Sequence, residues 1–354
     1  MKRNYGIDLL RMVLMFMVVV LHVLGHGGVL DTAVPLSMNY ALAWLLECFA
    51  YCAVNCYALI TGYVYYNSKY RLSSLIQIWI QVWIYSFGIS VAMWILKPEY
   101  FSIEGLIRAA LPVTYKMYWY FSAYVGLFML IPILNAAIEC MSENKTKNVL
   151  LLSALFFSVI PVVSGEDPFG DKGGYSTFWL AYLYLIGASI RKYEWEKVLK
   201  NSANNIYIYI FSVCISWVCK LAGDYVRILL PEGIPIVFNL VSYTSPTMVL
   251  AAIGLFLTFR QVELGQRASK IVATLSPAAF GVYLIHEQIN VKSYFISDRF
   301  CFLASANPAG LIIGVIGCAF AVFAVCLIAD YVRLIVFKKL KIKEKVAIAD
   351  RIMQ

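Results

Sequence analysis

Two histidines and an arginine interrupt an otherwise apolar stretch near the start of the chain, RMVLMFMVVVLHVLGHGG, which runs from Arg11 to Gly28. An imidazole can act as base, acid or nucleophile near neutral pH, whereas a guanidinium group stays charged and suits phosphate or carboxylate. At about 100° per residue, the steps from Arg11 to His22 close three helical turns with about 20° left over. His26 and Asp8 fall about 60° to either side of Arg11. The spacing therefore predicts one helix face with a cation and, about 16 Å further along, an imidazole.

This polar stripe has two interpretations. In the first, Asp8 and Arg11 form an i,i+3 pair, and the histidines bond carbonyl groups of neighbouring helices. In the second, the stripe is a functional site. The full stripe, followed by Gly27 and Gly28, favours the functional interpretation, because ionisable groups inside a membrane are costly.

The composition places the chain in a membrane. Of its 354 residues, 62% are hydrophobic and only 14% are charged, whereas soluble domains are about one quarter charged. The mean hydropathy is +0.75. The net charge of +9 comes from basic residues in short loops between apolar blocks. Such loops indicate membrane topology and contact with anionic lipids, and they argue against nucleic acid as a partner.

The apolar blocks predict an all-α integral membrane protein with about ten transmembrane helices. The blocks are residues 9–30, 40–65, 72–96, 118–141, 149–164, 175–190, 206–222, 245–259, 271–291 and 308–332. With a cytoplasmic N-terminus, the cytoplasmic segments hold 20 Lys and Arg and the external loops hold 8, as the positive-inside rule requires. Both termini are then cytoplasmic. We expect a multi-pass protein of the cell membrane, with a ten-span domain at 1–337 and a basic cytoplasmic tail at 338–354.

The nine cysteines do not suggest a disulfide framework or a metal centre. Cys48, Cys52 and Cys56 are four residues apart, so they share one helix face, and no Cys-x-x-Cys occurs. Small thiol side chains suit a helix–helix contact. We therefore expect packing at these positions and no metal site.

Five stretches with specific order and spacing follow one another along the chain. The first is the pattern Asp8-x-x-Arg11-x10-His22. The others are VNCYALITGYV (Val54–Val64), YWYFSAYVGLFMLIPILN (Tyr118–Asn135), FWLAYLYLIGASIRKY (Phe178–Tyr193) and FGVYLIH (Phe280–His286). The first resembles the signature of the acyltransferase-3 family of membrane acyltransferases, and the other four are similar to later segments of that family. The family's ten-span core with cytoplasmic termini agrees with the charge count.

The resemblance implies a donor, an acceptor and a catalytic pair. The expected reaction moves an acyl group, usually acetyl, from acetyl-CoA to an extracytoplasmic hydroxyl, often of a glycan. The family's Arg-x10-His pair falls on Arg11 and His22, with His22 as base or acyl carrier. The family's Arg-x-Arg pair, linked to acyl-CoA, corresponds to Lys69 and Arg71. A lysine side chain lacks the planar fork with which arginine binds two phosphate oxygens at once. Phosphate binding is therefore better founded for Arg71 than for Lys69. No permanently bound cofactor is expected, and acetyl-CoA is the donor substrate.

Several other ionisable residues are candidates for supporting roles. His286 and Glu287 lie toward the outer end of the ninth predicted span, where they either position an acceptor sugar or form a buried histidine site at a helix end. Glu47 in the second span is expected to orient a histidine or pair with a cation. His26 is a neighbour of the site, because only His22 keeps the x10 spacing.

Aromatic and amide residues complete the candidates. Tyr118 and Trp119 begin the fourth span and suit an interfacial aromatic belt or a platform for a sugar. Asn55 places an amide inside the bundle and suits an interhelical tie. Asp330 is expected to pair with Arg333.

The competing function is a transporter or flippase for a glycan precursor or a small anionic metabolite. A carrier would also have many spans and ionisable residues at mid-membrane. Against it stand the lack of detectable repeats and of Gly/Pro-broken spans in paired positions. We therefore expect an acyltransferase that transfers groups other than aminoacyl groups. Its expected partners are acyl-CoA, a surface glycan or lipid-linked saccharide acceptor, and membrane lipids. The acceptor contacts are expected from external loops 97–117 and 223–243.

Overall fold

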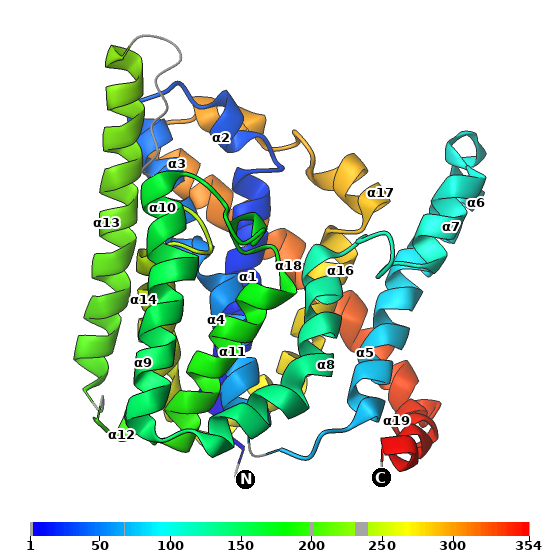
Figure 1. Ribbon diagram of the computed structural model, residues 1–354. Coiled ribbons are helices and arrows are strands. Elements are labelled where there is room, and N and C mark those ends of the chain that lie inside the picture. Colours follow the sequence, from blue (N-terminus) through cyan, green and yellow to red (C-terminus); the bar gives the residue numbers. More distant parts are fainter. Residues whose placement is uncertain (1–2, 67, 199–200, 231–239, 354) are drawn as a thin grey trace.

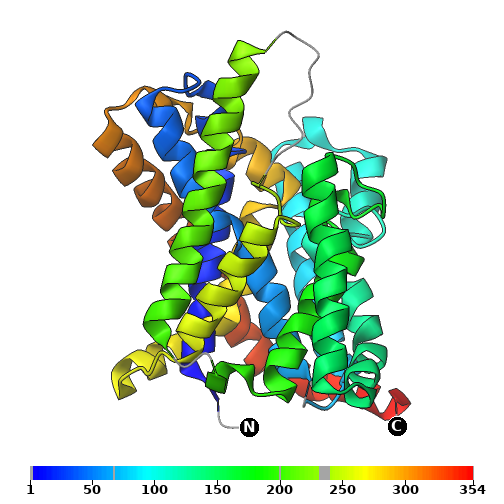
Figure 2. The same cartoon turned by 60° about the vertical axis from the view of Figure 1, so that its left-hand side comes forward.

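The computed structural model describes residues 3–66, 68–198, 201–230 and 240–353. Within these ranges the chain forms helices, turns and loops and no strand. Figures 1 and 2 show long helices that run side by side in one bundle. The predicted all-α integral membrane fold is confirmed. Residues 231–239 of the predicted acceptor loop lie outside the described residues.

Eight helical segments of the described chain are long and apolar enough to cross a membrane. They are α1 with α2 (Tyr5–Leu24, Val29–Thr32), α3 with α4 (Met38–Tyr51, Ala53–Tyr65), α5 with η1 and α6 (Leu72–Trp83, Ile84–Gly88, Ile89–Leu96), α8 (Trp119–Cys140), α9 with η3 and α10 (Glu143–Ala154, Leu155–Val159, Ile160–Ser164), α13 (Ser202–Leu229), α15 with η5 and α16 (Gln266–Leu275, Ser276–Ala278, Ala279–His286) and α18 (Pro308–Lys339). Shorter helices include η2 (Pro98–Tyr100), α7 (Ile103–Ala110), η4 (Lys172–Gly174), α12 (Trp195–Val198), α17 (Ile289–Val291), η6 (Lys292–Ile296) and η7 (Cys301–Ser305).

The two remaining predicted spans are shorter than a bilayer requires. Helix α11 (Thr177–Lys192) has 16 residues and α14 (Pro246–Arg260) has 15. At 1.5 Å per residue they are about 23 to 24 Å long, less than the roughly 30 Å of hydrocarbon. Eight of the ten predicted spans therefore meet the length criterion. The other two can be short because much of each is buried among other helices.

Helix α13 extends beyond the predicted seventh span, which ends at residue 222. It continues to Leu229. Lys220 and Asp224 lie one turn apart and form an ion pair of 2.7 Å, and the Tyr40 hydroxyl donates to the Asp224 carboxylate at 2.7 Å. These partners satisfy the polar groups, so the helix continues through them.

Helix α1 is the central element of the bundle (Figure 1). It contacts α3, α4, α14, α16 and α18. It begins after Asn4, whose side chain accepts a hydrogen bond from the Ile7 backbone amide at 3.0 Å, as a helix cap does. It is followed by a turn that includes Gly28 at φ +82°. The polar stripe predicted from the sequence consequently lies among other helices.

Helices α4 and α11 touch at their backbones. A Cβ atom at Gly62 would lie 2.0 Å from the Tyr184 carbonyl oxygen, and one at Gly187 would lie 2.1 Å from the Leu59 carbonyl oxygen. Small residues permit such close approach between helices in membranes. This contact holds α4 in place beside α1, where α4 lines the candidate site.

The start of α1 and the C-terminal segment lie at the same end of the bundle, here called the basal end (Figure 1). After α18, the chain forms α19 (Ile342–Val346) and η8 (Ala347–Met353), and both pack against α5. An even number of crossings places both ends on one side. That this side is cytoplasmic stays a prediction from the charge count.

Candidate active site

The polar stripe of α1 starts with the predicted local ion pair. Arg11 Nη1 lies 3.0 Å from Asp8 Oδ1, and Arg3 Nε lies 2.5 Å from Asp8 Oδ2. The pairing interpretation is therefore correct for Asp8 and Arg11. The Arg11 side chain is nevertheless one-third exposed and lines a cavity. Arg11 can thus be paired and still present positive charge to a ligand.

His22 forms a hydrogen-bonded chain with a second histidine, 264 positions away in the sequence. His22 Nδ1 lies 2.7 Å from His286 Nε2, and His286 Nδ1 lies 2.5 Å from the carbonyl oxygen of Val282. A carbonyl oxygen only accepts, so His286 Nδ1 carries the proton. When both rings are neutral, His286 Nε2 accepts from His22 Nδ1–H. The remaining nitrogen of His22, Nε2, then has a free lone pair.

Glu287 places a carboxylate beside this pair. Its Oε2 lies 3.3 Å from His22 Nδ1 and 3.8 Å from His26 Nε2, and this buried atom has no hydrogen-bond partner among the residues that the structure describes. Its Oε1 binds Lys292 Nζ at 2.6 Å. A carboxylate at this distance favours a positive charge on His22 during a reaction. The sequence reasoning missed Lys292, which the chain carries five residues after Glu287.

The same three residues have the composition of a metal site. The ligand atoms of His22, His286 and Glu287 lie within 4.8 Å of one another. Two nitrogens on one tetrahedral zinc ion, each at about 2.05 Å, would be roughly 3.3 Å apart. The observed 2.7 Å between the two rings is a hydrogen-bond distance. In this arrangement the histidines are bonded to each other and not spaced as ligands of one ion.

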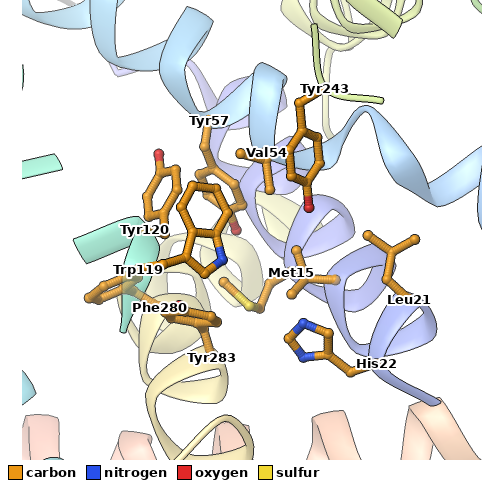
Figure 3. Close-up of a pocket in the computed structure, with 11 residues that line it drawn as sticks. Met15, Leu21, His22, Val54, Tyr57, Trp119, Tyr120, Tyr243, Phe280 and Tyr283 are labelled. Carbon is orange, nitrogen blue, oxygen red and sulfur yellow. The ribbon is translucent and has the colours of Figure 1, made fainter. Parts of the chain in front are cut away.

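His22 lies at the edge of a cavity of about 40 Å³, here called the histidine cavity (Figure 3). Figure 3 shows one nitrogen of its ring directed toward Met15 and Trp119. Because Nδ1 is engaged with His286, the nitrogen that faces the cavity is Nε2. The other lining residues are apolar or aromatic: Met15, Val18, Leu21, Val54, Tyr57, Trp119, Tyr120, Tyr243, Phe280 and Tyr283. This lining suits a small acyl group beside a base.

Two further cavities lie between the histidine cavity and the basal end. A middle cavity of about 240 Å³ is lined by Arg11 and shares Tyr57, Tyr120 and Phe280 with the histidine cavity. A basal cavity of about 580 Å³ shares Ile78 with the middle cavity. The three cavities therefore follow one another, and each shares lining side chains with the next.

The basal cavity is lined by basic side chains from three segments. They are Arg71, Arg333, Lys338 and Lys343. Arg333 is paired with Asp330, as predicted, through contacts of 2.7 and 2.8 Å. Lys69, the other half of the predicted donor pair, is exposed and is not among the lining residues. The structure thus brings Arg71 to the cavity, and it adds three basic residues from the C-terminal part that the sequence reasoning missed.

Glu47 is separate from the histidine cluster. It is buried, and its Oε2 has no hydrogen-bond partner among the described residues. No ion pair or hydrogen bond joins it to a histidine in the described part of the chain, so the structure does not show the predicted orienting contact. Burial raises the pKa of Tyr175, a hydrogen bond with Tyr243 lowers it, and the negative charges of Glu47 and Glu287 raise it.

The aromatic pair at the start of α8 faces the protein interior, so its assignment to an interfacial belt was wrong. Tyr118 is buried and its hydroxyl donates to the Leu284 carbonyl at 2.9 Å. Trp119 lines the histidine cavity, with its ring 4.4 Å from that of Tyr175 and 5.9 Å from that of Tyr243. The alternative interpretation of Trp119 as a platform for a ligand fits this position.

Asn55 is the predicted interhelical tie. Its amide group donates to the Tyr243 carbonyl at 2.8 Å and accepts from Trp179 Nε1 at 3.0 Å. The side chain is fully buried, so both bonds are shielded from water. Asn55 thereby holds the turn that carries Tyr243 against α4 and α11.

Comparison with known proteins gives a family and no nearer relative. Neither the curated proteins nor the solved structures contain a significant match. The family model described as an acyltransferase domain matches residues 4–331. That range includes His22, His286 and the residues between the three cavities. This protein, a multi-pass membrane protein by its helices, therefore belongs to the acyltransferase-3 family.

Proposed function

We propose that this protein transfers an acyl group, in the first instance acetyl, from acyl-CoA to a hydroxyl of a glycan or lipid-linked sugar. Family membership supports a membrane acyltransferase in general terms. The observation that carries the finer proposal is the position of His22. Its Nε2 faces a cavity that shares residues with the middle cavity, which in turn shares Ile78 with the basic cavity at the basal end.

Acyl-CoA, the proposed donor, fits the three neighbouring cavities. Acyl-CoA is a polyanion with a long flexible arm that ends in a thioester. Its phosphates match the basic residues of the basal cavity, in which Arg71 offers the planar fork that binds phosphate oxygens in pairs. Nε and Nη2 of Arg333 are already paired with Asp330, so Arg333 contributes its remaining N–H groups. The arm then passes Arg11 in the middle cavity. The thioester carbonyl reaches the histidine cavity, which lies about 16 Å further along α1.

His22 supplies the proton chemistry. In direct transfer, Nε2 takes the proton of the acceptor hydroxyl as the hydroxyl oxygen attacks the thioester carbonyl. The new acyl–oxygen bond forms and the carbon–sulfur bond breaks. The CoA sulfur leaves with the proton that His22 returns. In two-step transfer, Nε2 attacks the carbonyl and CoA leaves as its thiolate. The acceptor hydroxyl oxygen then attacks the acyl group, the acyl–Nε2 bond breaks, and the hydroxyl proton ends on the CoA sulfur. Both routes require the free lone pair of Nε2.

The residues around His22 support either route. His286 accepts from Nδ1–H and so keeps the ring in the productive tautomer and orientation. Glu287, 3.3 Å away, stabilises the positive charge that forms on the ring. Trp119 and Tyr243 line the same cavity and offer aromatic faces to a sugar. On the charge count, the basal end faces the cytoplasm and the protein resides in the cell membrane.

The test uses inside-out membrane vesicles supplied with acetyl-CoA labelled in the acetyl group. We expect label on a glycan or lipid-linked saccharide with the wild-type protein. His22→Asn should lose about 100-fold to 10,000-fold in rate, the range for removal of a general base. His26→Asn is the matched control, because His26 is a half-exposed neighbour that does not line the cavity, and it should keep most of the activity. Uptake of label without covalent transfer would favour a carrier, and full transfer by His22→Asn would remove His22 from the mechanism.

A further inference from the structure

The C-terminal segment, residues 342–353, forms one wall of the basal cavity. Ile342, Lys343, Ala347 and Asp350 are among the lining residues. The segment follows a turn at Lys341, whose φ is +52°, and it packs against α5 (Figure 1). Within residues 342–351, most side chains are exposed and the others are partly exposed. The segment is therefore a surface attachment to the bundle and not part of its core.

The principal polar contact of this segment is made by Asp350. Its Oδ1 accepts from the Ser73 backbone amide at 2.8 Å, and its Oδ2 accepts from the Ser73 hydroxyl at 2.7 Å. Ser73 lies in the first turn of α5, and Arg71 at the N-cap position makes no side-chain capping bond. Asp350 thus supplies the cap from the far end of the chain. Hydrogen bonds from Ser73, together with the nearby Arg71 charge, hold the pKa of Asp350 below its usual value.

The groups around Asp350 are those that a phosphate would use. The Ser73 backbone amide and hydroxyl hold the carboxylate, and the charge of Arg71 lies nearby. A backbone amide in the first helical turn, a serine hydroxyl and an arginine all bind phosphate oxygens well. Ser73 is 5% exposed, so Asp350 must move away before another anion can reach it. Arg71, Arg333 and Lys338 line the same cavity outside the segment. They stay available to hold the ligand after the segment leaves.

We propose that residues 342–353 act as a displaceable latch on the donor site, in which the Asp350 carboxylate occupies the position of a donor phosphate. Acyl-CoA and the latch then compete for Ser73 and Arg71. This proposal rests on the proposed donor function. Acyl-CoA binds only to molecules in which the latch is open. The apparent dissociation constant for acyl-CoA is therefore the intrinsic constant divided by the fraction of molecules with an open latch. It also keeps the basal cavity covered when donor is scarce.

Steady-state kinetics of the full-length protein test the competition. Asp350→Ala should lower the KM for acetyl-CoA by roughly threefold to tenfold, because the open fraction rises toward one. The turnover at saturating donor should stay unchanged. Glu344→Ala is the matched control, because it removes an acidic side chain from the same segment that does not line the cavity. An unchanged or increased KM in Asp350→Ala would overturn the latch.

Limited trypsin digestion provides a readout that needs no catalysis. The segment carries Lys343, Lys345 and Arg351, which trypsin can cut when the latch opens. Adding CoA to the detergent-solubilised wild-type protein should speed cleavage several-fold, whereas Asp350→Ala should be cut quickly without CoA. Slower cleavage with CoA would show that the segment helps to bind the donor, and the proposal would fail. If CoA releases the segment but no acyl transfer occurs, the latch stands and the proposed enzymatic function fails.

Discussion

Replacing His286 with leucine tests the hydrogen-bonded chain that prepares His22 for catalysis. Leucine has a volume close to that of histidine and has no acceptor. The substitution removes the 2.7 Å contact between the rings and the bond to the Val282 carbonyl. His22 Nδ1–H would then lose its acceptor at 2.7 Å and keep only the longer contact of 3.3 Å with Glu287 Oε2. The tautomer with the proton on Nε2, which leaves no lone pair toward the histidine cavity, then becomes more populated.

The size of the effect follows from the cost of the unpaired donor. Leaving a buried donor without any partner costs about 1 to 3 kcal/mol, and the longer contact with Glu287 keeps the cost toward the lower end of that range. A free-energy cost of about 1 to 3 kcal/mol lowers the population of the productive tautomer by about fivefold to 150-fold. We therefore expect the turnover at saturating substrates to fall within that range. The loss should be smaller than that of His22→Asn, because His22 itself is still present.

The assay measures turnover and both Michaelis constants in reconstituted membranes. His286→Gln is the informative companion, because its amide oxygen can accept from His22 Nδ1–H, and it should recover part of the rate. Thermal unfolding in detergent controls for loss of structure. Unchanged turnover in a folded His286→Leu protein would refute the orienting role. A change confined to the KM for the acceptor would assign His286 to acceptor binding instead.

Two further predictions concern the donor cavity and the support of the site. Arg71→Ala should raise the KM for acyl-CoA about tenfold, the value expected for a lost charged hydrogen bond, while Lys69→Ala should have a smaller effect because Lys69 does not line the cavity. An unchanged donor KM in Arg71→Ala would exclude Arg71 from phosphate binding. Asn55→Leu leaves Trp179 Nε1 and the Tyr243 carbonyl unpaired, so it should destabilise the protein by about 1 to 3 kcal/mol. A melting temperature in detergent equal to that of the wild type would show that Asn55 is not a structural tie.

Local features of the site were predictable from the sequence because helix geometry alone determines them. Arg11 and His22 share a face of α1 through their spacing, and the Asp8–Arg11 and Asp330–Arg333 pairs follow from the i,i+3 neighbourhood. Hydropathy located the apolar blocks, although it did not show that α11 and α14 are short. Hydropathy measures how apolar a segment is and does not tell lipid contact from contact with other helices.

Contacts between distant segments were decided only by the tertiary structure. Nothing in the spacing of the residues places His286 on His22, or Asp350 on Ser73 at a separation of 277 positions. Tryptophan is a residue type that suits a membrane interface. The packing of α8 nevertheless places Trp119 in the lining of the histidine cavity. Each of these pairings depends on the order, rotation and tilt of packed helices, which arise from many side-chain contacts at once. The sequence determined a membrane bundle with a polar first helix, and the packing determined which groups that helix meets.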